Sequence, residues 1–224
     1  EKEENKPLVN KSLTSYSQLN QDINVLDFYN HKKEGYFIDI GAYDGIKFSN
    51  TYLLEKDYNW KGICVEPGKR FYDKLKKNRT THCINKAIYK ESGCELSFID
   101  CGDNHDKGSM LSGLELTAGY RSKKCEQSTY LVNTIRLDEL LKEYNAPSFI
   151  DYLSIDVEGA ELEVLKSIDF TNYSFGYISI EHNNNTAVKE EFHKIFTNNG
   201  YIFKQFNKFD VDYIHKSLVN VNND

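Results

Sequence analysis

The sequence offers little from which a cysteine-based structure could be built. Its 224 residues include five cysteines, an odd number, and no two of them form a Cys-x-x-Cys pair. Disulfide frameworks and zinc sites both rely on paired cysteines at characteristic spacings. We therefore expect reduced thiols at all five positions, which are Cys64, Cys83, Cys94, Cys101 and Cys125.

The sequence also lacks a long hydrophobic run. No stretch approaches the ~20 apolar residues that a helical membrane span requires, and residues 1–6 are too polar for a signal peptide. These absences predict a soluble, cytoplasmic protein that binds no membrane. Because the first residue is Glu1 rather than methionine, we also expect the chain to be a piece of a longer polypeptide.

An excess of positive charge is missing too. The formal net charge is −6, so a nucleic-acid surface would need a local basic patch against the overall field. A modest basic cluster lies within residues 69–79, where helical spacing favours an ordinary solvated face. We therefore expect no nucleic-acid partner.

What the sequence does contain is enough length for one α/β domain with a substantial core. Residues 1–14 are polar and without a hydrophobic period, which predicts a flexible lead-in to a single domain over residues 15–224. In that domain, apolar strand patterns alternate with helical ones. The alternation predicts a mainly parallel sheet with helices on both faces, closed by an antiparallel hairpin near residues 201–215.

The most informative stretch is residues 35–45. An apolar run reaches Asp39 and then breaks into Gly41 and Gly45, which indicates a buried strand that enters a tight, ligand-facing turn. Ser49 can cap a following helix, whose first backbone N–H groups would then be available to an anionic group. Strand, glycine turn and helix make half of a nucleotide-type site, although an ordinary strand-to-helix turn can also require glycine.

A second strand pattern, residues 60–67, ends at Glu66 after one complete helix, as a strand-helix-strand unit requires. An acid at this place can accept hydrogen bonds from both ribose hydroxyls of a nucleoside. Dinucleotide sites carry Gly-x-Gly-x-x-Gly, whereas Tyr43 stands here at the place of the middle glycine. The spacing favours S-adenosylmethionine, which has a ribose and no phosphate, over NAD.

Residues 101–129 have no regular hydrophobic period and gather small and polar side chains. A segment of this length without elements of its own, inside a compact domain, is often a lid or a substrate loop. It follows the third predicted strand, residues 81–88, and should therefore hang over the carboxyl ends of the sheet, where ligands bind in open α/β folds. We expect it to recognise the acceptor; a surface excursion without function is the alternative.

Acids recur at the ends of two later strand patterns. One pattern ends in Asp156 and Glu158, and the next ends in Glu181, His182 and Asn183. If these strand ends are adjacent, His182 is the best general base by its intrinsic pKa, with Asp156 and Glu158 as catalytic neighbours. Alternatively, Asp156, Glu181 and Asn183 supply oxygen ligands to Mg²⁺, which would lower the pKa of an acceptor hydroxyl.

Taken together, several segments resemble the FkbM family of S-adenosylmethionine-dependent methyltransferases. The first half of the likeness rests on Tyr-Ser-Gln and Gln-Asp within residues 16–22, Phe-Ile-Asp-Ile-Gly-Ala at 37–42, and Ser-Asn-Thr with Leu-Glu-Lys within 49–56. The second half rests on Trp-Lys-Gly-Ile-Cys-Val-Glu-Pro at 60–67, Ser-Gly-Leu at 112–114, Leu-Ser-Ile-Asp-Val-Glu-Gly at 153–159 and Glu-Leu-Glu-Val-Leu at 161–165.

The resemblance implies the Rossmann-like class I methyltransferase fold, in which a seven-stranded, mostly parallel sheet ends in an antiparallel strand. It also implies O-methyl transfer to a hydroxyl of a sugar, a glycan or a related small molecule. The implied cofactor residues are Gln21, Asp39, Gly41, Ala42, Tyr43, Asp44, Asn50, Thr51, Glu66, Pro67, Lys86, Ala87 and Asp156. Among them, Glu66 should hold the ribose, and Lys86 and Ala87 should flank the adenine. Tyr43 departs from the family, in which asparagine is common.

Two other function classes stay open. One is a catalytically degenerate nucleoside-binding module of the same fold, and the other, which fits the glycine spacing less well, is a NAD-dependent oxidoreductase. The joint presence of Asp39, Glu66, Asp156 and Glu158 favours a catalytic methyltransferase over both.

Overall fold

The computed structural model describes residues 13–101, 112–115 and 127–219. Seven strands of this part form one sheet, in the order β10-β11-β9-β8-β1-β2-β3. Their bounds are β1 Tyr36–Ile40, β2 Lys61–Val65, β3 His82–Ile84, β8 Phe149–Ile155, β9 Ser174–Glu181, β10 Tyr201–Asn207 and β11 Asp210–His215. The five strands from β9 to β3 are parallel to one another.

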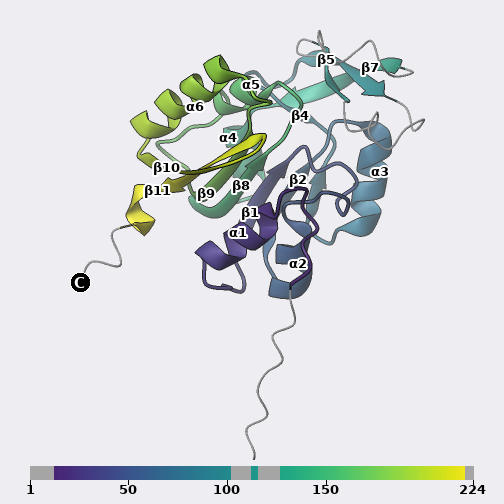
Figure 1. Ribbon diagram of the computed structural model, residues 1–224. Coiled ribbons are helices and arrows are strands. Elements are labelled where there is room, and N and C mark those ends of the chain that lie inside the picture. The colour runs from purple at the N-terminus through teal and green to yellow at the C-terminus, as the bar shows by residue number, and fades with distance from the viewer. Residues whose placement is uncertain (1–12, 102–111, 116–126, 220–224) are drawn as a thin grey trace, which may run out of the picture.

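Strand β11 runs antiparallel to both of its neighbours, β9 and β10. This arrangement confirms the predicted class I fold with its C-terminal antiparallel hairpin, which lies on the left in Figure 1. The central strands have almost continuous apolar sequences because helices bury both of their faces. In β1, for example, every residue after Tyr36 is buried.

Helices cover both faces of the sheet, and α1 and α2 lie on the near side in Figure 1. Helices α1 Gln21–Phe28, α2 Tyr52–Tyr58 and α3 Lys69–Asn78 share a core with Phe37. Helices α4 Leu137–Glu143, α5 Glu161–Leu165 and α6 Thr186–Asn198 share the opposite core with Ile38. Adjacent residues of a strand point to opposite faces, so β1 serves both cores.

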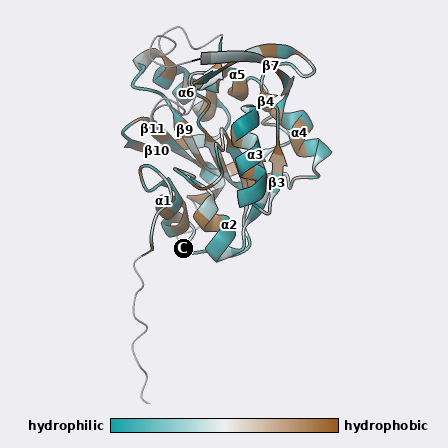
Figure 2. Cartoon of the chain, turned by 90° about the vertical axis from the view of Figure 1, so that its right-hand side faces the viewer, coloured by the Kyte–Doolittle hydropathy of each residue, from teal (hydrophilic) through white to brown (hydrophobic). Residues whose placement is uncertain are grey.

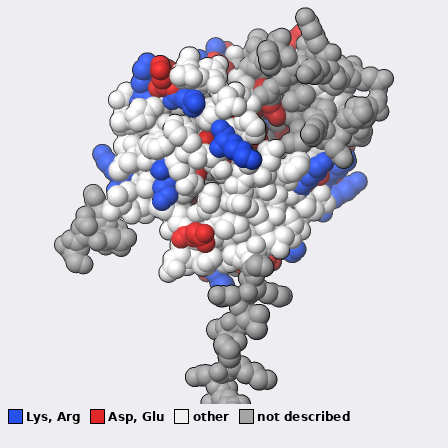
Figure 3. Space-filling view, viewed as in Figure 1, with Lys and Arg blue, Asp and Glu red and all other residues white. Residues whose placement is uncertain are grey.

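The predicted basic helix is α3. It buries Phe71 and Leu75, and its outward side is hydrophilic (Figure 2), as expected of a solvated face. On the side of the molecule that Figure 3 presents, basic side chains stand in separate groups with uncharged surface between them. Among the described helices, none combines the length and the hydropathy that a membrane crossing needs.

A smaller sheet lies beside the main one, at the upper right in Figure 1. It contains β4 Ala87–Ile88, β5 Glu95–Cys101, β6 Gly113–Leu114 and β7 Gln127–Ile135, in the order β4-β7-β5-β6. Phe98, Leu114 and Val132 belong to its own apolar cluster. A short 3-10 helix, Lys216–Leu218, follows β11.

The single strand predicted over residues 81–88 is wrong. The chain divides there into β3 and β4, which belong to different sheets. The side chain of Asn85, between the two strands, donates hydrogen bonds to the carbonyl oxygens of Glu66 and Pro67 at 2.8 and 3.0 Å. These bonds hold the point at which the chain leaves the main sheet.

The expectation of reduced thiols is also wrong at one position. Cys64, Cys83 and Cys94 are free, but Cys101 is disulfide-bonded; Cys125 lies outside the described residues. Strand β5 pairs with β7 so that Cys101 stands opposite Gln127. This pairing brings together residues that are far apart in the sequence, and the spacing of the cysteines alone does not reveal it. The cytoplasmic location stays a prediction.

Candidate active site

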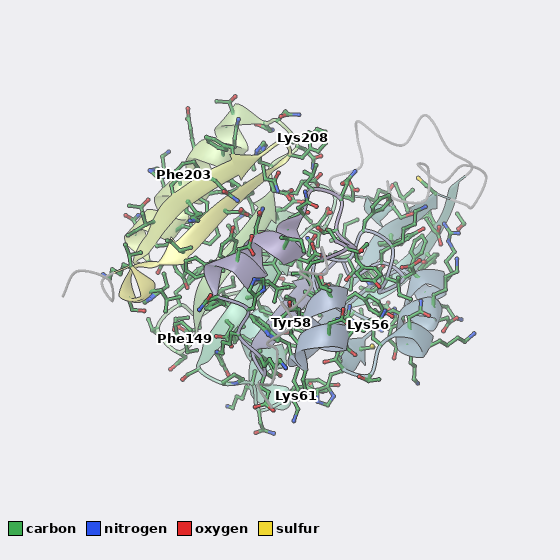
Figure 4. The ribbon with its side chains drawn as sticks, turned by 60° about the horizontal axis from the view of Figure 1, so that its bottom comes forward. Lys56, Tyr58, Lys61, Phe149, Phe203 and Lys208 are labelled. Carbon is green, nitrogen blue, oxygen red and sulfur yellow. The ribbon has the colours of Figure 1, made fainter. Side chains whose placement is uncertain are left out.

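A pocket with roughly 970 Å³ of open space lies at the carboxyl ends of β1, β2 and β8. Figure 4 shows the two edges of the sheet. Lys61 and Phe149, the first residues of β2 and β8, lie at the amino-end edge, and Lys208, in the turn of the hairpin, lies at the opposite edge. The pocket brings together most of the residues predicted for the site: Asp39, Gly41, Ala42, Tyr43, Asn50, Glu66, Pro67, Ala87, Asp156 and Glu158.

Gly41 makes the sharp turn that opens the pocket. Its φ is +90°, and a Cβ at this position would lie 1.7 Å from the backbone oxygen of Asp156. The N–H groups of Gly41 and Ala42 both donate to the carbonyl of Val65, at 2.9 and 3.1 Å. Glycine is therefore required both by the backbone conformation and by the close approach of the chain that follows β8.

Glu66 lies in the pocket wall with 6% of its surface exposed. Its Oε1 accepts the N–H of Gly68 at 2.7 Å, and its Oε2 accepts the N–H of Tyr43 at 2.9 Å. Burial raises the pKa of Glu66 to about 8, although the two backbone hydrogen bonds oppose the rise. A carboxylate oxygen can accept two hydrogen bonds, so each oxygen retains room for one donor from a ligand.

Tyr43 has a φ of +49°, in the left-handed region. This conformation is uncommon for a residue with a side chain, and it points the N–H of Tyr43 at Glu66. The ring of Tyr43 lies 4.6 Å from the ring of Phe71, centroid to centroid, and both residues line the pocket. Tyr43 therefore contributes both its backbone and an aromatic wall.

Asp39 and Thr51 form a buried layer beneath the glycine turn. Thr51 Oγ1 donates to Asp39 Oδ2 at 2.6 Å and accepts from Arg79 Nη2 at 3.0 Å. Burial raises the pKa of Asp39, while the positive charge of Arg79 and the bond from Thr51 oppose the rise. The layer fixes the end of β1 against the start of α2.

Three acids meet at the ends of β8 and β9. The carboxylate oxygens of Asp156, Glu158 and Glu181 all lie within 4.8 Å of one another. Glu158 has a φ of +59°, and strained backbone of this kind is common in functional sites. Asn183, the third member of the predicted metal set, donates from Nδ2 to Glu181 Oε2 at 2.6 Å. Glu158 thus joins Asp156 and Glu181 in this cluster, Asn183 lies beside Glu181, and a metal ion held by Asp156, Glu181 and Asn183 stays a prediction.

Residues 39–203, most of the chain, match the Methyltransferase FkbM domain. This chain belongs to the FkbM methyltransferase family. The comparison with curated proteins gave no match.

Several solved structures have a similar fold and are distant in sequence. Methyltransferase FkbM from Methylobacillus flagellatus KT is 13% identical with a TM-score of 0.50, over 81% of this chain and 44% of that one. Precorrin-6y C5,15-methyltransferase from Geobacter metallireducens GS-15 is 9% identical with a TM-score of 0.48, over 92% and 95%. The N-terminal domain of human METTL16 in complex with SAH is 14% identical with a TM-score of 0.48, over 90% and 70%. Our chain thus spans less than half of the FkbM protein from Methylobacillus.

The lining of the pocket includes an apolar group and a polar group of residues. Phe71 and Phe98 lie beside Glu66, since a Cβ on Gly68 would meet all three, and the apolar lining also includes Ala87, Ile88 and Leu114. Around the end of β8, the lining is polar, with Ser154, Asp156 and Glu158. Ser112, Gly113 and Leu114, which are among the described residues of the predicted acceptor segment at 101–129, line the pocket.

Four residues predicted to bind the cofactor of this FkbM domain do not line the pocket. Gln21 donates from Nε2 to Asp210 Oδ2 at 2.5 Å, and Asp44 accepts the backbone N–H groups of residues 46 and 47. Thr51 lies in the layer below the turn, and Lys86 is absent from the lining. Gln21, Asp44 and Thr51 shape the site through other residues.

His182, the predicted base, is 2% exposed and does not line the pocket. Its Nδ1 accepts the N–H of Asn184 at 2.9 Å, and its Nε2 has no hydrogen-bond partner. In the neutral ring, Nε2 must then carry the proton, which leaves neither nitrogen free to accept one. Burial lowers the pKa of His182 further.

Arg79 is the important residue of this FkbM site that the sequence did not indicate. Its side chain is fully buried, and its Nε donates to Glu55 Oε2 at 2.5 Å. Nη1 donates to the carbonyl of Gly45 at 3.2 Å and to Ser49 Oγ at 3.3 Å. One guanidinium therefore supports the end of the glycine turn and the start of α2.

Proposed function

We propose that this domain binds S-adenosylmethionine and transfers its methyl group to a hydroxyl of a sugar, a glycan or a related small molecule. The observation that carries the proposal is the carboxylate of Glu66, which retains one acceptor position on each oxygen. This arrangement fits the adjacent hydroxyls of a ribose. The absence of a Gly-x-Gly-x-x-Gly turn and the family membership both favour this cofactor over NAD.

The pocket residues fit the remaining parts of the cofactor. The apolar lining around Phe71, Ala87 and Phe98 suits an adenine, and the left-handed turn at Gly41 leaves backbone close to the amino-acid end. When bound, S-adenosylmethionine supplies an electrophilic methyl group on a positively charged sulfur. The chain must then align the acceptor oxygen with that methyl and remove the hydroxyl proton.

We place proton removal on the carboxylates at the ends of β8 and β9. Asp156 and Glu158 line the pocket, and Glu181 lies within 4.8 Å of them. His182 is the weaker candidate because Asn184 occupies its Nδ1. The same three carboxylates are also the groups that would coordinate Mg²⁺, in which case the ion would orient the hydroxyl and lower its pKa.

The test is methyl transfer from radiolabelled S-adenosylmethionine to a panel of methyl glycosides. We expect Glu158→Gln to lower kcat by ~10²–10⁴-fold, the usual contribution of general acid–base catalysis, and to leave the affinity for S-adenosylhomocysteine within a few-fold. Glu163→Gln is the matched control, since Glu163 is an acid on the surface of α5 that pairs with Lys166.

Two further arms separate the alternatives. A loss of turnover in His182→Ala, with unchanged thermal stability and cofactor affinity, would move the base from the carboxylates to the histidine. Inactivation by EDTA with recovery in Mg²⁺ would assign the acids to a metal. Tight binding of S-adenosylhomocysteine without transfer to any hydroxyl would favour the degenerate module, and tighter binding of NAD would contradict the proposal.

A further inference from the structure

Phe48 is a partly exposed aromatic side chain in the wall of the pocket. It lines the pocket and is nevertheless 40% exposed, so it stands at the mouth. Its φ is +58°, a conformation that is a genuine outlier for a bulky residue. Such strain persists only where the surrounding structure enforces it.

The N-terminal strap, residues 15–22, enforces this conformation. Ser17 forms a parallel β-bridge with Phe48. Asp22, which is fully buried, accepts from Ser15 Oγ at 2.6 Å, from Ser17 Oγ at 2.8 Å and from the N–H of Tyr16 at 2.8 Å. These hydrogen bonds within the strap hold Ser17 in place next to Phe48.

The strap is fixed at its other end as well. The side chain of Asn207 donates to the carbonyl of Leu19 at 2.9 Å, and Gln21 donates to Asp210. Asp210 pairs with Glu181 across β11 and β9, so the strap joins the rim at Phe48 to the strand that carries the acid cluster. Gln21 and Asp22 are the Gln-Asp pair of the family resemblance. Their hydrogen bonds therefore hold the strap beside Phe48 and the acid cluster.

Phe48 and the ribose acceptor Glu66 reach the pocket from different segments of the chain. Glu66 follows β2 and lies beside Phe71 and Phe98, since a Cβ on Gly68 would lie within 3.3 Å of all three. Phe48 lies beyond Gly45, after β1, in the same part of the chain as Lys47, whose Nζ is 5.4 Å from the centre of the ring. A half-exposed ring at the mouth is available to the second substrate.

We infer that Phe48 is the platform on which the acceptor sugar stacks. The face of an aromatic ring carries partial negative charge, and one face of a pyranose presents C–H groups of partial positive charge. Contact between these faces buries apolar surface and leaves the hydroxyls at the sugar's edge directed at Asp156 and Glu158. The inference deepens the proposed function and rests on it.

The experiment exploits the left-handed backbone. Glycine adopts positive φ without strain, so Phe48→Gly removes the ring while keeping the turn, and Phe48→Trp retains an aromatic face. Phe203→Ala is the control, because Phe203 is 39% exposed and lies on the outer strand of the hairpin (Figure 4). The acceptors are methyl pyranosides and glycerol, whose hydroxyls belong to no ring.

We expect Phe48→Gly to lower kcat/KM for the pyranosides at least tenfold, mainly through KM. Phe48→Trp and Phe203→Ala should stay within threefold of the wild type, and glycerol should be methylated equally by all variants. Equal loss for glycerol, or an acceptor KM that Phe48→Gly leaves unchanged, would overturn the platform while the proposed function stands.

The affinity for the cofactor tests the alternative that Phe48 contacts the cofactor rather than the acceptor. If Phe48→Gly weakens the binding of S-adenosylhomocysteine tenfold or more, the ring belongs to the cofactor site and the inference is wrong. If the wild type methylates neither the pyranosides nor glycerol, the proposed function fails, and the platform fails with it.

Discussion

The carboxyl of Glu66 should make cofactor binding depend on pH. Burial raises its pKa to about 8, so near neutral pH the group is mostly protonated in the empty pocket. Hydrogen bonds from two ribose hydroxyls favour the ionised form. Binding of S-adenosylhomocysteine should therefore release a proton, and the affinity should rise with pH until the pKa of the free pocket is passed.

The size of the effect follows from linkage. Below the pKa of the empty pocket, the dissociation constant should fall by about tenfold per pH unit. Between pH 6 and pH 8 the affinity should then rise by up to about two decades, or ~2.5 kcal/mol. Close to one proton should be released at pH 7.

The stability of the empty protein should change in the opposite direction. Between the ordinary pKa of 4.5 and about 8, the folded chain binds more protons at Glu66 than the unfolded chain does. Stability therefore falls as pH rises through this window, by an amount on the order of a few kcal/mol. Glu66→Gln should be more stable than the wild type at pH 8.

The assay is isothermal titration with S-adenosylhomocysteine at pH 6, 7 and 8, in buffers of different ionisation enthalpy. Glu66→Gln should release no proton and bind with little pH dependence, at ~1.5–3 kcal/mol lower affinity than the wild type at pH 8. This variant also controls for Asp210, whose pKa burial raises to about 7. Binding by the wild type without proton release and without a pH trend would refute the reasoning.

Two further predictions concern the frame of the site. Gly41→Ala should weaken the binding of S-adenosylhomocysteine more than tenfold, because its Cβ would meet the backbone of Asp156. Gly93→Ala, at a similar φ of +75° in open space, should leave that affinity unchanged and cost only ~1 kcal/mol in urea unfolding. An equal loss of affinity in the two variants would contradict the close approach at Gly41. Arg79→Met should cost ~3–5 kcal/mol of stability, because it leaves buried acceptors without their cation. Lys166→Met, which removes an exposed ion pair, should cost ~0–1 kcal/mol, and a similar small loss for Arg79→Met would refute the role of the buried guanidinium.

The sequence alone predicted the features that depend on local pattern. The apolar run before Gly41 and the acid at Glu66 predicted the two strands and the turn between them, because buried parallel strands and positive-φ turns leave clear signatures. The alternation of elements and the family motifs predicted the seven-stranded sheet, which the structure confirms.

Features that depend on distant contacts were not predictable in the same way. Arg79 directly follows the lysine-rich helix α3, and nothing in that stretch of sequence marks it as a cation that turns inward to Glu55. Gln21 was assigned to the cofactor but bonds to Asp210, 189 positions away. The disulfide at Cys101 depends on the pairing of β5 with β7. Each of these features is set by the tertiary arrangement.

The central claim is that the pocket holds S-adenosylmethionine with its ribose on Glu66. A crystal structure of the chain with S-adenosylhomocysteine tests this claim most directly. The account predicts both ribose hydroxyls within hydrogen-bond distance of the two Glu66 oxygens, and the adenine among Phe71, Ala87 and Phe98. A nucleoside bound elsewhere, or a ribose that makes no contact with Glu66, would contradict it.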